Sequence, residues 1–423
     1  MTLSITEYGL IRRIRDFPDR TNSLTELFLA DVAFEALKNF VTDNEADAVM
    51  TFFLQRGREC IRVKNYVGLL ETSDGTQLEI LPKNVGEEPD AARTALLRML
   101  LHLRNSPFRA VESVRLGISR LPLWEVFIAM FLDEVTPLLT RGLQKAYVSQ
   151  TRNQRFLKGK LELAEQIRQN RHHAERMIVT FDEQTTNLPP NRLLKSALAF
   201  VQTRARTIPN QSRIRQMLFA MEDIPPSDRI ADDLRAVAMG NRLFAHYQPA
   251  LRWAEALLSG RAFGLAAGKH LNLALLFPME RVFEDYVAAG FKRYVTTGDV
   301  VVQESSQHLI DNHSGLRKFK LRPDLILRQN GVTTVLDTKW KRIDAMNTAG
   351  NYGIDQADLY QLYAYGKKYG ASELVLIYPS NALFHKPLDL FGYDETLHLR
   401  VVPFDVNVPL EEAVLNVMMN DER

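Results

Sequence analysis

RPDLILRQNGVTTVLDTK, residues 322–339, predicts two β-strands joined by a tight turn. The Asn-Gly dipeptide at its centre, residues 330–331, is typical of a type I′ turn, in which both central residues need a positive φ. With these two as the turn residues, the strand register places Asp324 directly opposite Asp337. Residues paired in this way have Cβ atoms roughly 4.5–5.5 Å apart. Strand alternation puts Lys339 on the same face as Asp337.

The two opposed carboxylates indicate a site for metal-assisted cleavage of a phosphodiester. Two acids within reach of one hard divalent cation, beside an ammonium group, suit that chemistry. A surface hairpin with solvated Asp and Lys side chains is the alternative. The residues around the acids are apolar, at 325–327 and 335–336, so the carboxylates interrupt segments suited to burial. Two like charges in direct opposition also repel unless a cation or a proton lies between them.

The segments on either side of the hairpin predict further helices and strands. Downstream, residues 354–370 have the spacing of an amphipathic helix, in which Gln361 and Tyr365 lie four residues apart on one face. Upstream, residues 275–295 predict another helix, which carries Glu284. Short strands are predicted after these two helices, at 373–379 and 300–303.

This order of elements resembles the PD-(D/E)xK nuclease superfamily, and the downstream helix resembles its RecB-like branch. The residues that carry the resemblance are Glu284, Pro323-Asp324, Asp337-x-Lys339 and Gln361-x-x-x-Tyr365. The resemblance implies a C-terminal α/β domain of restriction-endonuclease type. It also implies that Asp324 and Asp337 bind Mg²⁺, for which Mn²⁺ is a possible substitute, together with Glu284 and the backbone carbonyl of Thr338. Mg²⁺ is commonly held by few carboxylates and several waters, which agrees with this set.

The resemblance also assigns a role to the lysine of the hairpin. Lys339 would position or activate the attacking water and stabilise the pentavalent phosphate. Stabilisation of developing charge is usually the largest catalytic contribution, so an ammonium group suits this position. The catalytic residues implied in this way are Asp324, Asp337, Lys339, Glu284, Gln361 and Tyr365.

Composition is that of an ordinary globular protein of two or three domains: 423 residues, 46% hydrophobic and 25% charged. Cys60 is the single cysteine, which excludes an internal disulfide and a cysteine-based zinc site and fits a reducing compartment. The N-terminus lacks a signal-peptide core, and no apolar run of about 18 residues occurs. We therefore expect a cytoplasmic protein without a membrane segment.

The distribution of charge is more informative than the formal net charge of +2. Residues 141–216 hold fifteen Lys or Arg and five Asp or Glu. Such a basic region can contact phosphates or face an acidic partner protein. The residues expected to contact DNA are Arg152, Arg155, Lys158 and Lys160.

The chain divides into three predicted parts and is expected to be an α+β multidomain protein. Residues 1–115 would form a β-containing domain, residues 116–265 a mainly helical basic region, and residues 266–423 the nuclease-like domain. In the first part, helices are predicted at 24–42, 44–56 and 90–103, and strands at 4–8, 60–64, 66–70 and 77–81.

The first two parts resemble the McrC family, the nuclease subunit of McrBC-type modification-dependent restriction systems. The resemblance covers most of the chain in the order of the family. It rests on Val67–Thr72 with Leu78–Lys83, on Arg155–Leu161, Phe181–Glu183 and Asn191–Lys195, and on Met279–Val287 ahead of the hairpin.

A McrC-like protein implies a partner. The resemblance implies an AAA+ GTPase hexamer of the McrB type, which translocates double-stranded, modified DNA and whose GTP hydrolysis the McrC-like chain stimulates. No nucleotide-binding G-x-x-x-x-G-K-[ST] sequence is present, so the chain itself is expected to bind no nucleotide. The β-hairpin around Ser73-Asp74-Gly75, with its exit at Lys83-Asn84, is expected to form part of the docking surface.

Two other functions remain open on the sequence. One is a stand-alone repair or recombination nuclease that uses the same site without a motor. The other is a non-catalytic adaptor that only activates an AAA+ ring. A single site cuts one strand, so double-strand cleavage would need two copies or two successive nicks. The remaining candidates for metal ligands are His172, His173, His308 and His313, which are more typical of polar surface.

Overall fold

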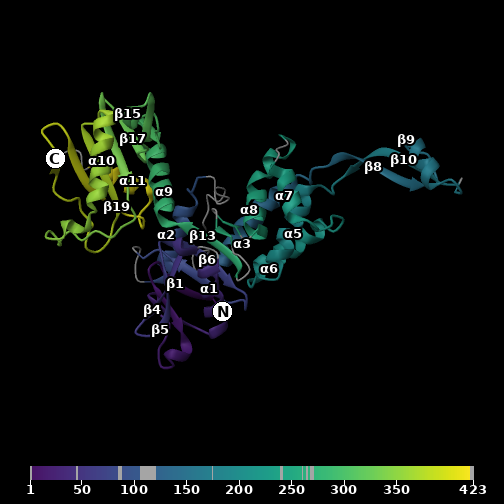
Figure 1. Cartoon of the computed structure of the whole chain (residues 1–423), viewed down its shortest axis with the longest axis horizontal. Helices are drawn as coiled ribbons and strands as arrows, with labels where there is room; N and C mark the ends of the chain where they lie inside the picture. The colour runs from purple at the N-terminus through teal and green to yellow at the C-terminus, as the bar shows by residue number, and fades with distance from the viewer. Residues whose placement is uncertain are drawn as a thin grey trace. The chain divides into compact units, whose positions relative to one another are not determined.

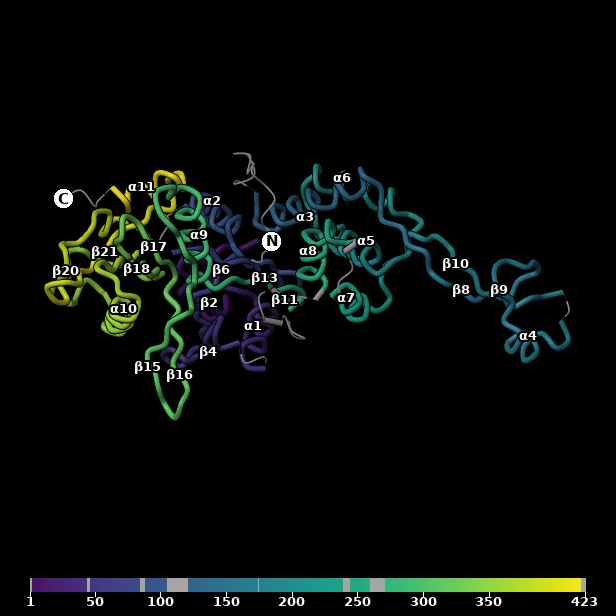
Figure 2. The backbone as a smooth tube through the Cα atoms, turned by 90° about the horizontal axis from the view of Figure 1, so that it is seen from above, coloured from purple at the N-terminus to yellow at the C-terminus, as the bar shows by residue number. Residues whose placement is uncertain are grey.

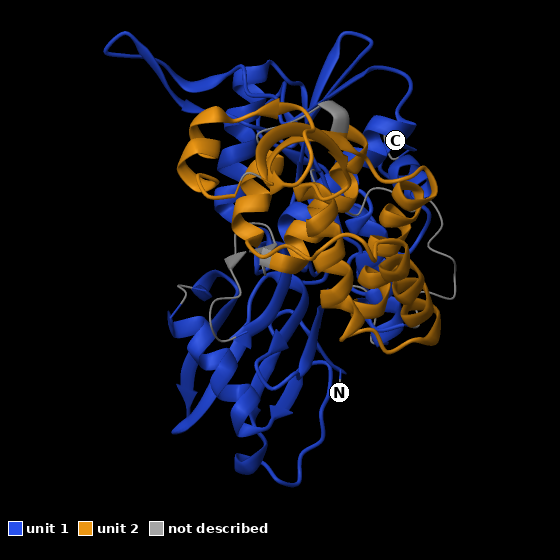
Figure 3. Ribbon diagram, turned by 90° about the vertical axis from the view of Figure 1, so that its right-hand side faces the viewer, with its two compact units in different colours: residues 1–123, 262–423 blue, residues 124–261 orange. Residues whose placement is uncertain are grey.

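The computed structural model in Figure 1 is a mixed α/β structure of helices and several sheets. It describes residues 2–43, 46–83, 88–104, 121–173, 175–238, 242–259, 261–262, 265–266 and 271–419. The chain forms two compact units, and Figure 3 colours them separately. The first unit contains residues 1–123 and 262–423, and the second contains residues 124–261. The predicted first and third parts of the chain thus belong for the most part to the same unit.

Two four-stranded sheets form the N-terminal part of the first unit. One has the order β1-β7-β6-β13 and the other the order β3-β2-β5-β4. The strands of the first sheet are β1 (Thr2–Thr6), β6 (Tyr66–Thr72), β7 (Gln77–Leu81) and β13 (Leu271–Pro278). Those of the second are β2 (Leu10–Arg13), β3 (Glu26–Leu29), β4 (Met50–Gln55) and β5 (Arg58–Val63).

A shared hydrophobic core joins these two sheets to helix α1 (Asp31–Asp43). Phe34, Leu37 and Phe40 on the buried face of α1 pack into it. Strand β13 contributes to the same core, although it lies some 200 residues later in the sequence. The N-terminal part therefore depends on a strand supplied from the C-terminal half of the chain.

The predicted hairpin is confirmed in the C-terminal part of the first unit. Strands β17 (Leu325–Gln329) and β18 (Val332–Thr338) pair antiparallel, with Gln329 opposite Val332. The turn residues Asn330 and Gly331 have φ of 50° and 79°, as a type I′ turn requires. The hairpin is placed in a six-stranded sheet of order β14-β17-β18-β19-β21-β20.

Helices cover both faces of this sheet. Leu362 and Tyr365 of α10 (Gln356–Tyr369) share a core with Ile326 and Val335 of the hairpin. Successive residues of a strand point to opposite faces of the sheet. On the face opposite α10, the ring of Phe404 packs against Phe283 and Tyr286 of α9 (Met279–Tyr294). The remaining elements here are α2 (Pro89–Leu100), β14 (Asp299–Val302), β15 (His308–His313), β16 (Leu316–Lys320), β19 (Glu373–Pro379), β20 (Phe391–Gly392), β21 (His398–Phe404) and α11 (Leu410–Met419).

The second unit combines a helical bundle with a long β-ribbon. The strands β8 (Ala146–Gln154) and β10 (Met177–Thr185) pair over nine residues, and β9 (Lys160–Leu161) adds to β10. Figures 1 and 2 show this ribbon reaching away from most of the helices of its unit, and Figure 2 shows the short helix at residues 163–169 near its far end. The helices are α3 (Leu123–Thr140), α4 (Leu163–Gln169), α5 (Pro189–Gln202), α6 (Ile208–Ala220), α7 (Ile230–Ala238) and α8 (Gln248–Ser259). The short strands β11 (Arg261–Ala262) and β12 (Leu265–Ala266) follow in the sequence, and β12 already belongs to the first unit.

Three local predictions were wrong. The helix predicted at 44–56 is not found in the described residues 46–56, where a short 3-10 turn at Ala46–Ala48 is followed by β4, which pairs antiparallel with β5; residues 44–45 lie outside the described part. The predicted helix at 24–42 starts later, since β3 precedes α1. The predicted helix at 275–295 begins only at Met279, because the apolar residues before it complete the N-terminal sheet as β13.

None of the helices in the described part of the chain is long and apolar enough to cross a membrane.

Candidate active site

Asp324 and Asp337 lie at the end of the hairpin farthest from its turn. Asp337 belongs to β18 and is 3% exposed, while Asp324 immediately precedes β17. The ladder ends at the pair Leu325 and Leu336, so the next position brings the two acids opposite each other. Asp324 Oδ2 accepts hydrogen bonds from the backbone N–H and from the hydroxyl of Thr338, both at 2.7 Å.

The two carboxylates influence each other's ionisation. Burial raises the pKa of Asp324 to about 6, and the charge of Asp337 adds to this effect. Burial likewise raises the pKa of Asp337, although the Lys339 ammonium opposes the shift. Because both pKa values are raised, negative charge is costly at this position unless a positive charge compensates it.

Lys339 supplies part of that compensation. Its Nζ lies 2.6 Å from Asp337 Oδ2 and 3.9 Å from Asp358 Oδ1, and it donates to Gln361 Oε1 at 3.3 Å. Burial alone would lower the pKa of Lys339, but Asp337 outweighs it and raises the pKa. Asp337 Oδ2 is buried, and the Lys339 ammonium is its partner. A carboxylate oxygen can accept more than one bond, so Asp337 could still bind a cation inside the site.

Helix α10 supports the hairpin from one side. The carboxylate of Asp355 accepts a hydrogen bond from the N–H of Ala357 at the start of the helix, at 3.0 Å. One face then brings Gln361 and Tyr365 together, with Gln361 Nε2 donating to the Tyr365 hydroxyl at 2.9 Å. That hydroxyl donates to the carbonyl of Arg322 at 3.3 Å. The predicted pair thus links Lys339 to the segment just before Asp324.

Glu284 approaches the site from α9 but is held by other residues. Its Oε1 accepts from Gln303 Nε2 and, at 3.0 Å, from Arg104 Nη2. Burial, followed by the charge of Asp324, raises the pKa of Glu284. Among the described residues, no three His, Cys, Asp or Glu side chains are grouped to hold a metal ion. Asp324 and Asp337 therefore form a two-carboxylate site, and Glu284 as a ligand stays a prediction.

Several residues of the site were not predicted from the sequence. Asp358 lies three residues before Gln361, so helical spacing could have indicated it. Arg104 binds both Glu284 and Asp285 across about 180 residues of sequence, and no local signal pointed to it. Gln303 also accepts a hydrogen bond from Arg322, which extends this polar chain along the edge of the site.

A buried contact connects the site to the N-terminal sheets within the first unit. Trp340, which follows Lys339, donates from Nε1 to Glu7 Oε1 at 2.6 Å. The backbone N–H of Lys83 donates to the same oxygen at 3.2 Å. Burial raises the pKa of Glu7 to about 7, against the opposing effect of these two partners. Asn84, part of the expected docking surface, lies outside the described residues.

The residues expected to contact DNA belong to the second unit. Arg152 pairs with Glu183 at 2.8 Å, and Lys158 Nζ lies 4.0 Å from the centre of the Phe181 ring. Arg155 is exposed, and the Lys160 side chain is 80% exposed. All four lie on or beside the β8–β10 ribbon, so they share an element with each other and not with the hairpin.

The histidines do not form a metal site: within the described ranges, none of the predicted alternatives belongs to a group of metal ligands.

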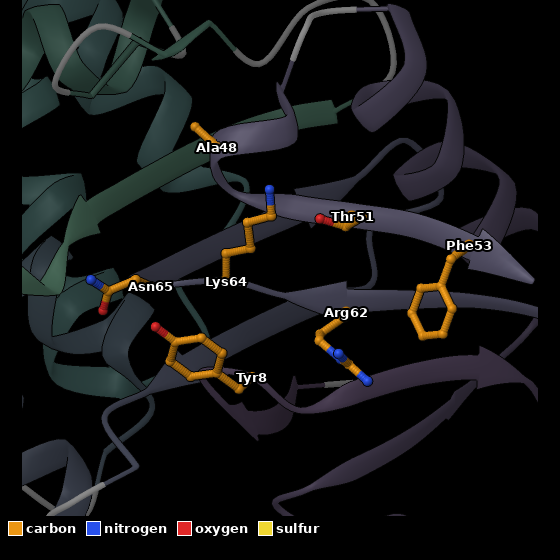
Figure 4. A pocket seen from close by; sticks show the side chains of 7 residues that line it. All are labelled: Tyr8, Ala48, Thr51, Phe53, Arg62, Lys64 and Asn65. Carbon is orange, nitrogen blue, oxygen red and sulfur yellow. The ribbon is translucent and has the colours of Figure 1, made fainter. Parts of the chain in front are cut away.

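A separate hollow lies in the N-terminal part, with a volume of about 480 Å³. Figure 4 shows the seven side chains that line it, which are Tyr8, Ala48, Thr51, Phe53, Arg62, Lys64 and Asn65. Its lining contains no carboxylate, so it is not a second acidic site.

Comparison with known families agrees with this structure. A family model described as "McrBC 5-methylcytosine restriction system component" matches residues 61–379. The chain therefore belongs to this family, as the sequence resemblance predicted. No curated protein matches the chain.

Solved structures show the same fold. A chain in the refined half-complex from the tetradecameric assembly of Thermococcus gammatolerans McrB AAA+ hexamers with bound McrC has a TM-score of 0.69 at 19% identity, covering 99% of this chain and 100% of that one. A chain in the cryo-EM structure of the Thermococcus gammatolerans McrBC complex has a TM-score of 0.51 at 19% identity, covering 71% and 89%.

Proposed function

We propose that this restriction-system component is its DNA endonuclease subunit, with a PD-(D/E)xK nuclease fold in the C-terminal part of the first unit. The observation that carries the proposal is the buried pair Asp324 and Asp337 at the end of the hairpin, with the Lys339 ammonium 2.6 Å from Asp337 Oδ2. Burial raises the pKa of both acids, so the two negative charges are costly unless positive charge compensates them, as a bound cation would.

The donor set fits a hard divalent cation. Mg²⁺ is usually held by one or two carboxylates together with waters and substrate phosphates. Asp324 and Asp337 would supply the carboxylates, with the carbonyl of Thr338 and, in the proposed set, Glu284. When bound, such a cation polarises a phosphoryl oxygen and lowers the pKa of a bound water.

The side chains of this chain would then do the following. Lys339, kept protonated by Asp337, would orient the attacking water and stabilise negative charge on the phosphate. Gln361 would fix the position of that ammonium through its 3.3 Å hydrogen bond. Thr338 would hold Asp324 by two hydrogen bonds, so that the carboxylate faces the reacting phosphate with little freedom.

We further propose that the chain acts with an AAA+ GTPase hexamer of the McrB type. The similar Thermococcus structure is an assembly of McrB AAA+ hexamers with bound McrC. The β8–β10 ribbon and the residues that connect its strands expose Tyr147, Phe156, Leu157, Leu163 and Ile167. Exposed apolar side chains on a projecting element are typical of a protein-binding surface, so we propose that this ribbon contacts the ring.

The predicted docking hairpin at residues 73–75 is less suited to this role. The Asp74 carboxylate accepts hydrogen bonds from Thr72 and Thr76 within the turn itself. The flanking Glu71 and Gln77 are buried. The turn therefore has few unused polar groups or exposed apolar side chains to offer a partner.

The test is cleavage of modified duplex DNA by the chain together with its AAA+ partner, GTP and Mg²⁺. Asp337→Ala is expected to lose cleavage while GTP hydrolysis by the ring is still stimulated. Asp389→Ala, which removes an exposed carboxylate of the same sheet domain, is the matched control and is expected to cut normally.

Other outcomes would change the assignment. An Asp337→Ala protein that cuts as well as the unmodified chain would refute the active site. Cleavage by the purified chain with Mg²⁺ alone would indicate a stand-alone nuclease. Stimulation of GTP hydrolysis by an unmodified chain that never cuts would indicate an adaptor.

A further inference from the structure

A second hairpin immediately precedes the active-site acids. Strands β15 and β16 pair antiparallel and are joined by Ser314-Gly315, with φ of 53° and 80°. Every residue from 309 to 320 is exposed. Figure 2 shows the two strands projecting from the sheet that carries the acids. The β15–β16 ribbon therefore offers both of its faces to a ligand.

The ribbon carries positive charge that the protein does not neutralise. Among the described residues, Arg317, Lys318 and Lys320 form no ion pair and no side-chain hydrogen bond. The acid of the ribbon, Asp311, is already bound by Lys368 at 2.7 Å. The three cations on β16 are thus available to an external anion.

An aromatic side chain lies between two of these cations. Phe319 is 73% exposed, although a residue of this size is usually buried. Its φ of 57° is in the left-handed region, which is a strained conformation for a bulky residue and is often found where the residue has a function. The register puts Lys318 opposite Ile310 and Lys320 opposite His308, so the two cations lie on either side of Phe319 along β16.

The base of the ribbon is fixed to the elements of the active site. The N–H of Leu321 donates to the carbonyl of Gln307 at 2.9 Å and closes the hairpin. Lys368, which holds Asp311, belongs to α10, the helix that also carries Gln361. The Tyr369 hydroxyl of the same helix donates to the carbonyl of Glu304 at 3.2 Å. These contacts set the direction of the ribbon relative to Asp324.

We propose that the β15–β16 ribbon is a binding element for duplex DNA that enters a groove beside the phosphate to be cut. The proposal rests on the nuclease function proposed above. A two-stranded β-ribbon fits the major groove, which is about 12 Å wide and about 8.5 Å deep. Strands of six and five residues, as in β15 and β16, are about 17–20 Å long, so the ribbon is long enough to reach the floor of the groove.

The side chains have distinct roles in this arrangement. In this proposal Lys318, Lys320 and Arg317 contact phosphates that border the groove. Phe319 packs against the edges or faces of bases. A protein partner would need acidic residues matched to all three cations, whereas a duplex presents phosphates on both sides of the groove.

Equilibrium binding of the full-length chain to a fluorescent duplex, in EDTA and over a range of salt, tests the proposal without needing catalysis. Lys318→Ala/Lys320→Ala is expected to weaken binding by roughly ten-fold and to reduce the slope of log K against log salt by about 2. The matched control, Lys292→Ala/Arg293→Ala, removes two exposed cations from the end of α9 and is expected to bind as the unmodified chain does.

Phe319→Ala separates stacking from charge. It is expected to weaken binding on the order of ten-fold, because contacts between bases and aromatic rings are lost, with an unchanged salt slope, because no charge is removed. Thermal unfolding of each variant checks that the fold is intact, which is expected since the substituted side chains are exposed.

Three results would overturn the proposal. The first is a ribbon variant that binds DNA as tightly as the control, and the second is an unmodified chain that does not bind duplex in EDTA. The third is a ribbon variant that keeps its DNA affinity but no longer associates with the AAA+ ring, which would assign the ribbon to the protein partner. Because Asp337 is not involved in these measurements, a failure here leaves the test of the nuclease function unaffected.

Discussion

The hairpin β17–β18 and the ribbon β15–β16 have the same backbone architecture but differ in their exposure to solvent. Each joins two short antiparallel strands through a two-residue turn with positive φ, at Asn330-Gly331 and at Ser314-Gly315. The hairpin is buried at the centre of a six-stranded sheet, while the ribbon is exposed along its length. Burial therefore decides what their charged residues can do: acids in the hairpin acquire raised pKa values, and cations on the ribbon remain free to bind anions.

The largest expected difference concerns one lysine from each element. Lys339→Ala is expected to reduce the cleavage rate about 10²- to 10³-fold, the range found when a group that stabilises a transition state is removed. Lys320→Ala is expected to leave the rate at saturating DNA unchanged and to raise the DNA concentration needed. Single-turnover kinetics over a range of DNA concentrations measures both quantities.

Lys339→Arg sharpens this test, because a planar guanidinium does not reproduce a compact ammonium at a confined position. It is expected to remain strongly impaired. If Lys339→Ala retained its cleavage rate and lost only DNA affinity, the buried lysine would act as the exposed one does, and the contrast between the two elements would disappear.

The next effect concerns the pH dependence of stability, compared between a buried and an exposed carboxylate. Glu7 has a pKa of about 7 in the folded protein against an ordinary 4.5. Between pH 4.5 and about 7 the folded state therefore binds the extra proton, and the free energy of unfolding falls as pH rises. The loss amounts to roughly 3 kcal/mol. Glu7→Gln is expected to remove most of it, measured by denaturant unfolding from about pH 5 to 8.

Asp311→Asn on the ribbon provides the comparison. Its partner Lys368 lowers the pKa of Asp311 below the usual value, so the carboxylate is ionised in the folded and the unfolded chain throughout this pH range. The slope of stability against pH is expected to match that of the unmodified protein. If the stability of Glu7→Gln changed with pH as steeply as that of Asp311→Asn and of the unmodified protein, Glu7 would not have a raised pKa.

A smaller effect is expected from equivalent glycines in the two turns. Gly331 and Gly315 have φ of 79° and 80°, and nothing lies within 4 Å of an added Cβ at either position. Valine is strained in this conformation at both, by about 1–3 kcal/mol. Gly331→Val is expected to lower the free energy of unfolding by that amount, because the hairpin is part of the sheet core.

Gly315→Val is expected to disorder the ribbon tip locally and to change global stability by less than about 0.5 kcal/mol. Thermal unfolding of the two variants measures the change in global stability, and protease sensitivity measures local disorder at the ribbon tip. Equal losses of global stability would mean that the ribbon belongs to the same cooperative unit as the hairpin.

The smallest effects are expected from two tyrosine hydroxyls on α10. Tyr365→Phe removes the hydrogen bonds to Gln361 and to the Arg322 carbonyl, and Tyr369→Phe removes the one to the Glu304 carbonyl. Each hydrogen bond contributes about 1 kcal/mol. We expect Tyr365→Phe to slow cleavage about five-fold with unchanged DNA affinity, and Tyr369→Phe to weaken DNA binding with an unchanged rate. If Tyr365→Phe instead weakened DNA binding and Tyr369→Phe slowed cleavage, the roles proposed for the hairpin and the ribbon would be wrong.

The hairpin was predictable because its determinants are local. An Asn-Gly turn and the alternation of apolar residues together specify the register, and the register places Asp324 opposite Asp337 without further information. The spacing of Gln361 and Tyr365 on α10 is local in the same sense. Each of these inferences used residues that are close in the sequence.

Other features depend on partners that are distant in the sequence. Ala46, Val49, Met50 and Phe53 have the i, i+3, i+4, i+7 spacing of a helix, but pairing with β5 makes the segment a strand. The contact of Arg104 with Glu284 spans 180 residues and has no local signature. The long strand β8 was missed because most of its residues are exposed, so that no apolar alternation marks it. Its partner β10 is partly buried, but its buried residues do not alternate regularly with exposed ones.

The connection between β13 and α9 has a consequence for how proteins of this kind can evolve. β13 ends at Pro278 and α9 begins at Met279, so the edge strand of the N-terminal sheet runs into the helix of Glu284 without an intervening loop. A genetic exchange that replaced the nuclease portion would have to carry this strand with it and match it to the host sheet at β6. The C-terminal portion is therefore not a freely interchangeable module, and its lineage is expected to be inherited together with that of the N-terminal sheets.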